Sequence, residues 1–220
     1  GSVNIALIAV FVIIMGWPDW RLPWRFVVGM QLVGILEASG VYKSAKNEAP
    51  WTKEELFKYS MEVMDQLETQ RIPEEEELNF LWESCKKEQE KNVAGKFRTR
   101  EEMDAVYGKG KWACVPAFVH TQPCGKMRRI DNARKGGQNR STAPKDKIHL
   151  CNAYQPAVKA RLLYDSLGKA GVDVAKEKIV LESGTEDLPN AYRSIPCDEE
   201  DLDCNIVAVR MPTTLVWWFI

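Results

Sequence analysis

The chain has 220 residues and a net charge of -1, with 45% hydrophobic and 28% charged residues. These values match soluble globular proteins, so they exclude a wholly disordered chain and one embedded throughout in a membrane, and they allow one domain or two small ones. Six cysteines lie far apart without a Cys-x-x-Cys pair, and only two histidines accompany them. We therefore expect reduced thiols in an intracellular protein, with neither a zinc site nor a disulfide framework.

The first segment, residues 1–15, is apolar from position 5 to position 15. Crossing a bilayer takes about 20 apolar residues, so a membrane anchor is not expected. The segment fits a buried strand or helix, or a piece separated from something upstream. Residues 17–50 are broken by prolines and glycines, which predicts loops and short apolar segments.

Three amphipathic helices are predicted between residues 50 and 110. Capping boxes at Thr52 with Glu55 and at Thr99 with Glu102 begin the first and third, and Pro73 begins the second. The acidic residues 74–77 in the first turn of the second helix interact favourably with the helix dipole. Cys85, further along the same helix, is expected in the core. The apolar faces of the first two helices comprise Leu56, Phe57, Val63, Met64 and Leu67, and Leu78, Leu81, Trp82 and Cys85.

The hydrophobic period changes after residue 110. Two β-rich runs, 111–120 and 125–133, predict a hairpin with a loop of about five residues. Residues 126–147 hold eight basic side chains, which fits either a solvated loop or a phosphate-facing surface, and Gly136 and Gly137 would let the backbone approach a phosphate. The basic residues are Lys126, Arg128, Arg129, Arg134, Lys135, Arg140, Lys145 and Lys147.

Downstream, residues 152–168 predict a helix with Leu163 and Tyr164 facing inward, and residues 177–187 predict a strand that ends at Asp187. A helical turn follows it. The acidic residues 198–203 are expected in a solvated connection, and two β-rich runs flank a Met-Pro-Thr-Thr turn. The final run, residues 215–220, is expected to be exposed aromatic β-structure that lacks a partner strand. The motifs of P-loop, dinucleotide-binding, serine-hydrolase and HExxH zinc proteins are absent from this sequence.

Two stretches together resemble reverse transcriptases. GKMRRIDNARKGGQN (residues 125–139) resembles their fingers hairpin, and EDLPNAYRSIP (186–196) resembles their first palm motif. The two occur in the family's order with a predicted helix between them. Residues 16–43 and 107–139 are also similar to the divergent reverse-transcriptase-like proteins of dinoflagellate genomes, so the resemblance spans residues 16–199.

The resemblance implies an α+β fold: right-hand polymerase fingers and an incomplete palm over residues 111–220, after a helical N-terminal region over residues 16–110. It implies an RNA-directed DNA polymerase, derived from a retroelement, that uses Mg²⁺ and dNTPs on an RNA template with a DNA primer. Asp187 would be the catalytic metal ligand, and Tyr192 the steric gate against ribonucleotides. Nucleotide contacts would come from Lys126, Arg128, Arg129 and either Asp131 or Asn132, with Gln122 as a further candidate.

Ordinary structural roles remain open for these residues. Asp187 could cap a helix, Tyr192 could be a core aromatic, and Arg128 could form a surface salt bridge. The sequence contains no Tyr-x-Asp-Asp turn to supply further metal ligands, and Pro189 departs from the family's pattern. We therefore expect a fragment, in the nucleus or cytoplasm, that lacks the C-terminal palm and thumb and is inactive alone. The alternatives are a non-catalytic nucleic-acid-binding remnant, or a degenerate protein without function.

Overall fold

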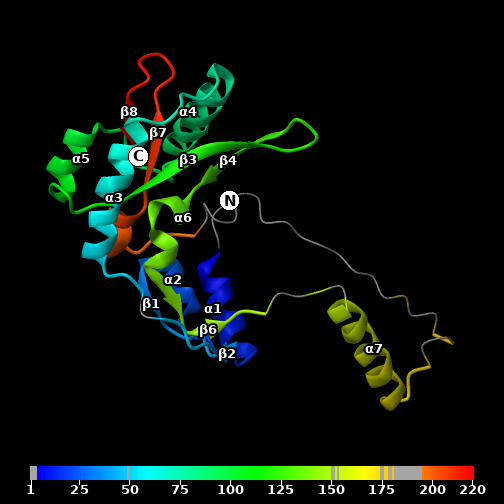
Figure 1. Ribbon diagram of the computed structural model, residues 1–220. Coiled ribbons are helices and arrows are strands. Elements are labelled where there is room, and N and C mark those ends of the chain that lie inside the picture. The colour runs from blue at the N-terminus through cyan, green and yellow to red at the C-terminus, as the bar shows by residue number, and fades with distance from the viewer. Residues whose placement is uncertain are drawn as a thin grey trace. The chain divides into compact units, whose positions relative to one another are not determined.

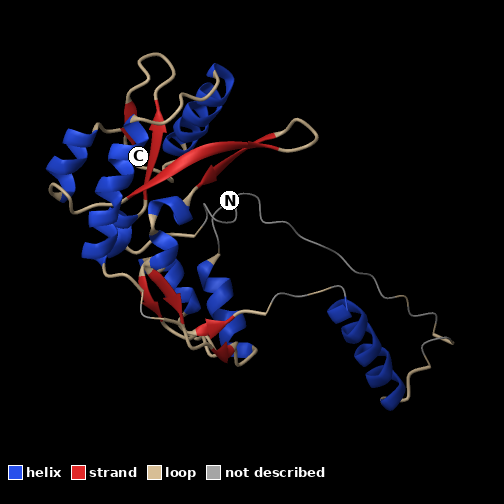
Figure 2. Ribbon diagram, in the orientation of Figure 1, coloured by secondary structure: helices blue, strands red, loops and turns tan. Residues whose placement is uncertain are grey.

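The computed structural model describes residues 4–48, 50–149, 152, 154–173, 176–177, 180 and 195–220. The chain divides into two compact units, Gly1–Lys147 with Tyr192–Ile220, and Ile148–Ala191. The first unit contains a mixed four-stranded sheet in the order β4-β3-β7-β8 (Figures 1 and 2). Its strands are β3 (Cys114–Thr121), β4 (Met127–Asp131), β7 (Ile206–Arg210) and β8 (Trp217–Phe219). β3 and β7 are parallel, and the two outer pairings are antiparallel.

Helices cover both faces of this sheet. On one face α3 (Lys53–Glu68) and α5 (Arg100–Tyr107) pack against Ile206 and Ala208 of β7. On the other face α4 (Glu75–Glu90) packs against Val207 and Val209. Every residue of β7 is buried, as is typical of a strand covered on both sides. The fold is thus mixed α and β, which is compatible with the expected α+β class.

The local signals for the three helices are confirmed. α3 and α5 begin at the predicted capping boxes, and all nine apolar residues predicted to face the core on α3 and α4 are buried. α4 begins at Glu75, two residues after Pro73, with Glu74 as its N-cap. Cys85 is fully buried. The predicted hairpin is confirmed as β3 and β4, joined by residues 122–126.

The C-terminal end of α3 is capped from the sheet. Arg210 Nη2 and Trp217 Nε1 both donate to the carbonyl oxygen of Leu67, at 2.9 Å and 3.2 Å. The Arg210 guanidinium also lies 4.9 Å from the centroid of the Trp217 ring. The last carbonyl groups of a helix have no partner within the helix, so these donors satisfy one of them and bind α3 to β7 and β8.

The acidic residues 198–203 are more ordered than the sequence suggested. Residues Glu199–Cys204 form the 3-10 helix η3, and Asp201 is only 5% exposed, so a solvated connection is wrong for this residue. Its carboxylate accepts the backbone N–H groups of Leu32 and Val33 and pairs with Lys53 at 3.1 Å. Burial alone would lower the pKa of Lys53, but its bonds to Asp203 and Asp201 outweigh this and raise the pKa to about 12.

The final aromatic run also differs from expectation. Phe219 is buried and packs edge-on against Trp112, with the two ring centroids 5.0 Å apart. It also exchanges two backbone hydrogen bonds of 2.9 Å with Arg98. Trp218 packs into the cluster beneath α4. The prediction of an exposed aromatic end without a partner is therefore wrong for these two residues, because β7 and Arg98 flank β8.

The remaining elements of the first unit are short. α1 (Ile5–Ile14) is a helix, as one of the sequence alternatives held, but Val12 is its only buried residue. α2 (Leu22–Val28) was not predicted. β1 (Gly34–Leu36) pairs with β5 (Thr142–Pro144), and β2 (Lys43–Ser44) with β6 (Asp146–Lys147). Within the described ranges, no helix has the length and apolar content to cross a membrane.

The second unit contains α7 (Tyr154–Lys169), which confirms the predicted helix. None of the side chains described in α7 is buried, and Leu163 is 47% exposed, so the predicted inward face of this helix is wrong. The helix therefore presents its leucines at the surface of the unit. Asp187 and Tyr192, with the strand and turn predicted around them, lie outside the described residues.

The turn after α6 (Ala133–Gly136) requires glycine. Gly137 has φ of 96°, and a Cβ at this position would lie 2.9 Å from Tyr59 Cδ1 and 3.0 Å from Leu56 Cδ1. A Cβ on Gly136 would lie 2.7 Å from the carbonyl oxygen of Cys114. Both glycines are buried, so the chain uses them for close packing against α3 and β3, which accounts for the pair without a phosphate.

Replacing Gly137 with alanine is expected to destabilise the protein by about 2–4 kcal/mol, because left-handed strain and a steric clash add together. Gly125→Ala is the matched control, since Gly125 has φ of 81° but a Cβ added there would meet no atom within 4 Å. This control should lose only about 1 kcal/mol. Urea unfolding measures both, and equal losses would show that the packing around Gly137 is not tight.

Candidate nucleic-acid interface

The two faces of the β3–β4 hairpin differ in what covers them. Side chains alternate along each strand, so every second residue points to the same face. Ala117 and Val119 pack into the cluster beneath α4. The opposite face carries four exposed side chains, two from each strand: Phe118, His120, Arg128 and Ile130. We call these four residues the open hairpin face.

The strand register brings the four residues together. Phe118 lies opposite Ile130, and His120 lies opposite Arg128. Directly opposed residues have Cβ atoms about 4.5–5.5 Å apart, so each pair is in side-chain contact range. Phe118 is 44% exposed and Ile130 is 40% exposed, in the part of the hairpin that extends beyond the pairing of β3 with β7. The face thus combines an apolar pair with an adjacent arginine and histidine.

The loop of the hairpin adds a further cation. Lys126 is exposed, and its carbonyl oxygen accepts the backbone N–H of Gln122 at 2.9 Å, which closes the loop. Lys126 directly precedes β4 and lies two residues before Arg128 in the sequence. Of the residues predicted to contact the nucleotide, Lys126 and Arg128 are exposed in this region.

Arg129 occupies the covered face instead. Its side chain is 5% exposed and forms a bidentate pair with Asp131 at 2.8 Å and 3.0 Å. Its Nη1 also contacts Glu88 and Cys85 of α4, at 3.0 Å and 3.1 Å. Burial alone would lower the pKa of Arg129, but the two carboxylates raise it above its ordinary value. The predicted contacts Arg129 and Asp131 are therefore engaged with each other in this structure.

The other predicted positions have local partners as well. The side chain of Asn132 accepts the N–H of Lys135 at 2.9 Å and caps α6. The Arg140 guanidinium lies 5.0 Å from the centroid of the Trp51 ring. Burial lowers the pKa of Lys135. Of the eight basic side chains in residues 126–147, six are exposed: Lys126, Arg128, Arg134, Arg140, Lys145 and Lys147.

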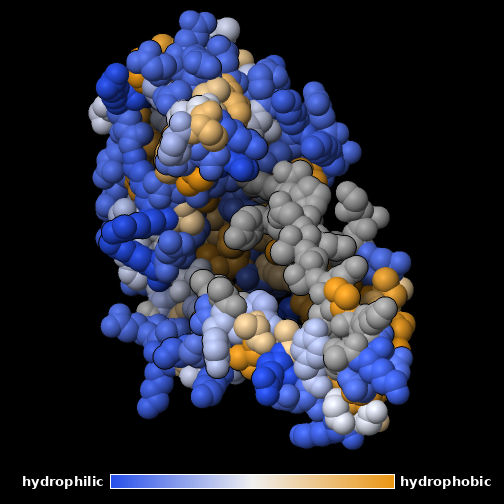
Figure 3. All heavy atoms as spheres, turned by 90° about the vertical axis from the view of Figure 1, so that its right-hand side faces the viewer, coloured by the Kyte–Doolittle hydropathy of each residue, from blue (hydrophilic) through white to orange (hydrophobic). Residues whose placement is uncertain are grey.

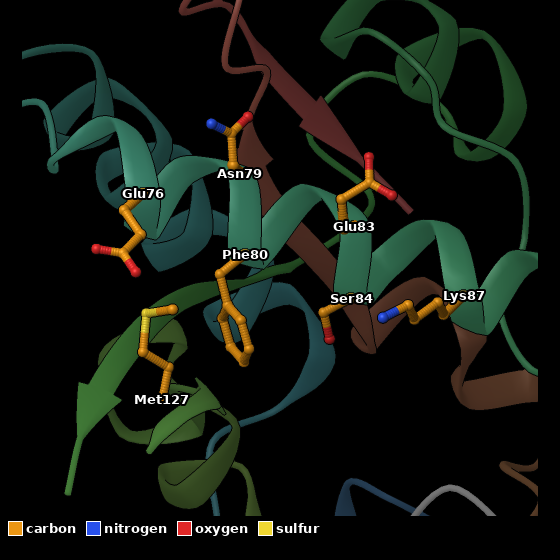
Figure 4. Close-up of a pocket in the computed structure, with 7 residues that line it drawn as sticks. All are labelled: Glu76, Asn79, Phe80, Glu83, Ser84, Lys87 and Met127. Atoms are coloured by element: carbon orange, nitrogen blue, oxygen red, sulfur yellow. The ribbon is translucent and has the colours of Figure 1, made fainter. Parts of the chain in front are cut away.

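A separate pocket of about 360 Å³ lies between α4 and the covered side of the hairpin (Figure 4). The Phe80 ring and Met127 point into the same space, with Glu76 beside them. Glu83 and Lys87 stand further along the helix. The carboxylates make this pocket a poor phosphate site, so it is distinct in chemistry from the open hairpin face.

On the side shown in Figure 3, the surface is mainly hydrophilic, with apolar side chains in small patches.

Sequence reasoning identified the cations but missed the apolar half of the open hairpin face. Phe118 and His120 share a face by simple alternation, and this could have been seen. The opposition of Phe118 to Ile130 depends on the hairpin register, which the loop length alone left undefined. The pocket beside Met127 could not be predicted from the sequence, because it depends on how α4 packs against the sheet.

Metal binding is considered separately from the binding of nucleic acid. Among the residues that the structure describes, no group of three or more histidine, cysteine or acidic side chains is placed to hold a metal ion. Asp187 lies outside them, so its role as a Mg²⁺ ligand stays a prediction.

Comparison of the chain with protein-family models, curated proteins and solved structures finds no match.

Neighbouring arginines should respond differently to the same substitution. Arg129→Met is expected to destabilise the fold by about 3–5 kcal/mol, because it removes the buried guanidinium that contacts the partly buried carboxylates of Glu88 and Asp131. Arg128→Met, on the open face, should change stability by no more than about 0.5 kcal/mol. Chemical denaturation with circular dichroism measures both. A small loss for Arg129→Met would contradict the structural role of its ion pairs.

Proposed function

We propose that this protein binds single-stranded nucleic acid through the open hairpin face and Lys126, as the fingers element of a reverse-transcriptase-like protein. The observation that carries the proposal is the register that places exposed Phe118 and Ile130 beside Arg128 and His120. An exposed aromatic ring flanked by cations is the combination that binds unpaired bases together with their phosphates.

Each part of the face has a distinct task. Arg128 and Lys126 attract the phosphate backbone, a contribution that weakens as salt rises. Phe118 offers its ring to an unpaired base, and such stacking contributes about 1–3 kcal/mol per base. A duplex keeps the faces of its bases stacked on one another, so the apolar pair favours single strands.

The covered side of the hairpin supports this use of the open side. Bidentate pairing with Asp131 and contact with Glu88 hold Arg129 against α4. Because β4 is fixed from behind, Arg128 and Ile130 are presented by a rigid strand rather than by a mobile loop. A fixed platform loses less conformational entropy when a ligand binds.

Phe118→Ala is expected to weaken binding of a single-stranded oligonucleotide by about tenfold, within the range of stacking energies. Arg128→Ala should also weaken binding and reduce the salt dependence by about one phosphate contact. Fluorescence anisotropy across a salt series measures both effects, with a duplex of the same sequence for comparison.

Arg71→Ala is the matched control, because this arginine is 89% exposed and lies outside the hairpin. It should leave binding and its salt dependence nearly unchanged. Equal loss in Arg71→Ala and Arg128→Ala would show that binding follows net charge alone. An absence of binding to any oligonucleotide at low salt would refute the proposal.

We also propose, from the sequence resemblance, that the parent activity is RNA-directed DNA synthesis. Asp187 would hold Mg²⁺, Tyr192 would exclude ribonucleotides, and Lys126 and Arg128 would contact the dNTP. The support is the order of residues 125–139 and 186–196 in the sequence and the exposure of Lys126 and Arg128. Two Mg²⁺ ions require more carboxylates than Asp187 alone provides.

We therefore expect this chain by itself to give no primer extension on a primed RNA template with Mg²⁺ and dNTPs. Asp187→Asn should leave oligonucleotide binding unchanged, because binding is assigned to the hairpin. A primer-extension gel and the anisotropy assay test these two statements together. Robust extension by the unmodified chain would overturn the expectation of inactivity, and loss of binding in Asp187→Asn would place Asp187 in the binding surface.

A further inference from the structure

The largest apolar side chains left exposed in the first unit gather on α1, α2 and the turn between them. Seven of these residues are each more than half exposed, and we call them the α1–α2 apolar surface: Phe11, Ile13, Ile14, Met15, Trp20, Trp24 and Val27. α1 and α2 pack against each other (Figure 1). Monomeric proteins rarely expose so much apolar area without a partner, so this surface calls for one.

The distribution around α1 indicates what kind of partner covers it. The packed positions of α1 lie on one side, and its exposed apolar residues span roughly 160° of the circumference at about 100° per residue. A helix that packs against a protein core typically uses a stripe only somewhat wider than about 100°. Residues 5–15 also contain no polar side chain, whereas a protein interface is normally bordered by a polar rim. Lipid acyl chains need neither a narrow stripe nor a rim.

The two tryptophans of the α1–α2 apolar surface suit the boundary of a bilayer. Trp20 and Trp24 are 73% and 63% exposed, and tryptophan is enriched at the level of lipid headgroups. The nearby charges are neutralised internally, because Arg21 pairs with Glu37 and Arg25 lies 3.7 Å from the buried Asp19. Attraction to anionic lipid therefore contributes little, and apolar burial supplies the main driving force.

We propose that the α1–α2 apolar surface inserts into the interfacial layer of a phospholipid bilayer. One side of α1 packs against α2 and buries Val12, so only the exposed side of this helix enters the interfacial layer. The site differs from the open hairpin face in its ligand, its residues and its expected response to salt. The inference does not depend on nucleic-acid binding.

The test uses the whole chain with phosphatidylcholine vesicles in a flotation assay at low and high salt. The unmodified protein should float with the vesicles at both salt concentrations. Ile13→Glu with Ile14→Glu should weaken binding by at least about tenfold, because two apolar groups are removed and two carboxylates resist entry into the bilayer. Both positions are more than 70% exposed, at 78% and 75%, so the variant should still fold, and circular dichroism checks this.

Val106→Glu on α5 is the matched control, since Val106 is 53% exposed but lies outside the α1–α2 apolar surface. It should float like the unmodified protein. Binding that disappears at high salt would overturn the proposal and point to the basic segment. Failure to float, together with concentration-dependent dimers that Ile13→Glu with Ile14→Glu abolishes, would show that a second copy covers the surface. Failure to float as a monomer would also refute it.

Discussion

The burial of β7 on both faces is the constraint on which the rest of the first unit depends. Ile206 and Ala208 pack with α3 and α5, and Val207 and Val209 pack with α4. Within β7 itself, Arg210 at the end of the strand is the one residue with a polar side chain, and it is buried too. Arg210 uses this position to cap α3, so the same strand provides the core and fixes a helix end.

β3 extends from this core into the hairpin, and that continuity gives the hairpin two unlike faces. Cys114 is buried with Ser60 donating to its Sγ, and burial raises the pKa of this thiol to about 11. Four residues later, on the same face, Phe118 is exposed. α4 extends along the opposite face as far as Arg129 and Met127. A strand anchored in a core can thus present a binding surface without a flexible loop.

Local signals in the sequence predicted the parts of the fold that short-range physics determines. Capping boxes, apolar periodicity and the hairpin loop gave α3, α4, α5 and β3–β4 correctly. The buried state of Asp201 was not predictable, because its backbone donors Leu32 and Val33 are more than 160 positions away. The same holds for the candidate site. Arg128 and Arg129 are the same residue type side by side, and only the packing of α4 decides that Arg129 is held and Arg128 is free to face solvent.

The place of β7 in the chain has a consequence for biosynthesis. Cys114 pairs with Ile206, so the strand at the centre of the sheet leaves the ribosome long after its neighbour β3. At translation rates of roughly 5–20 residues per second, the delay is on the order of 5–20 s. Throughout that interval the apolar faces of α3 and α4 lack the strand on which both pack. These apolar faces therefore stay uncovered until β7 has been synthesised, and the core of the first unit closes only after that strand is available.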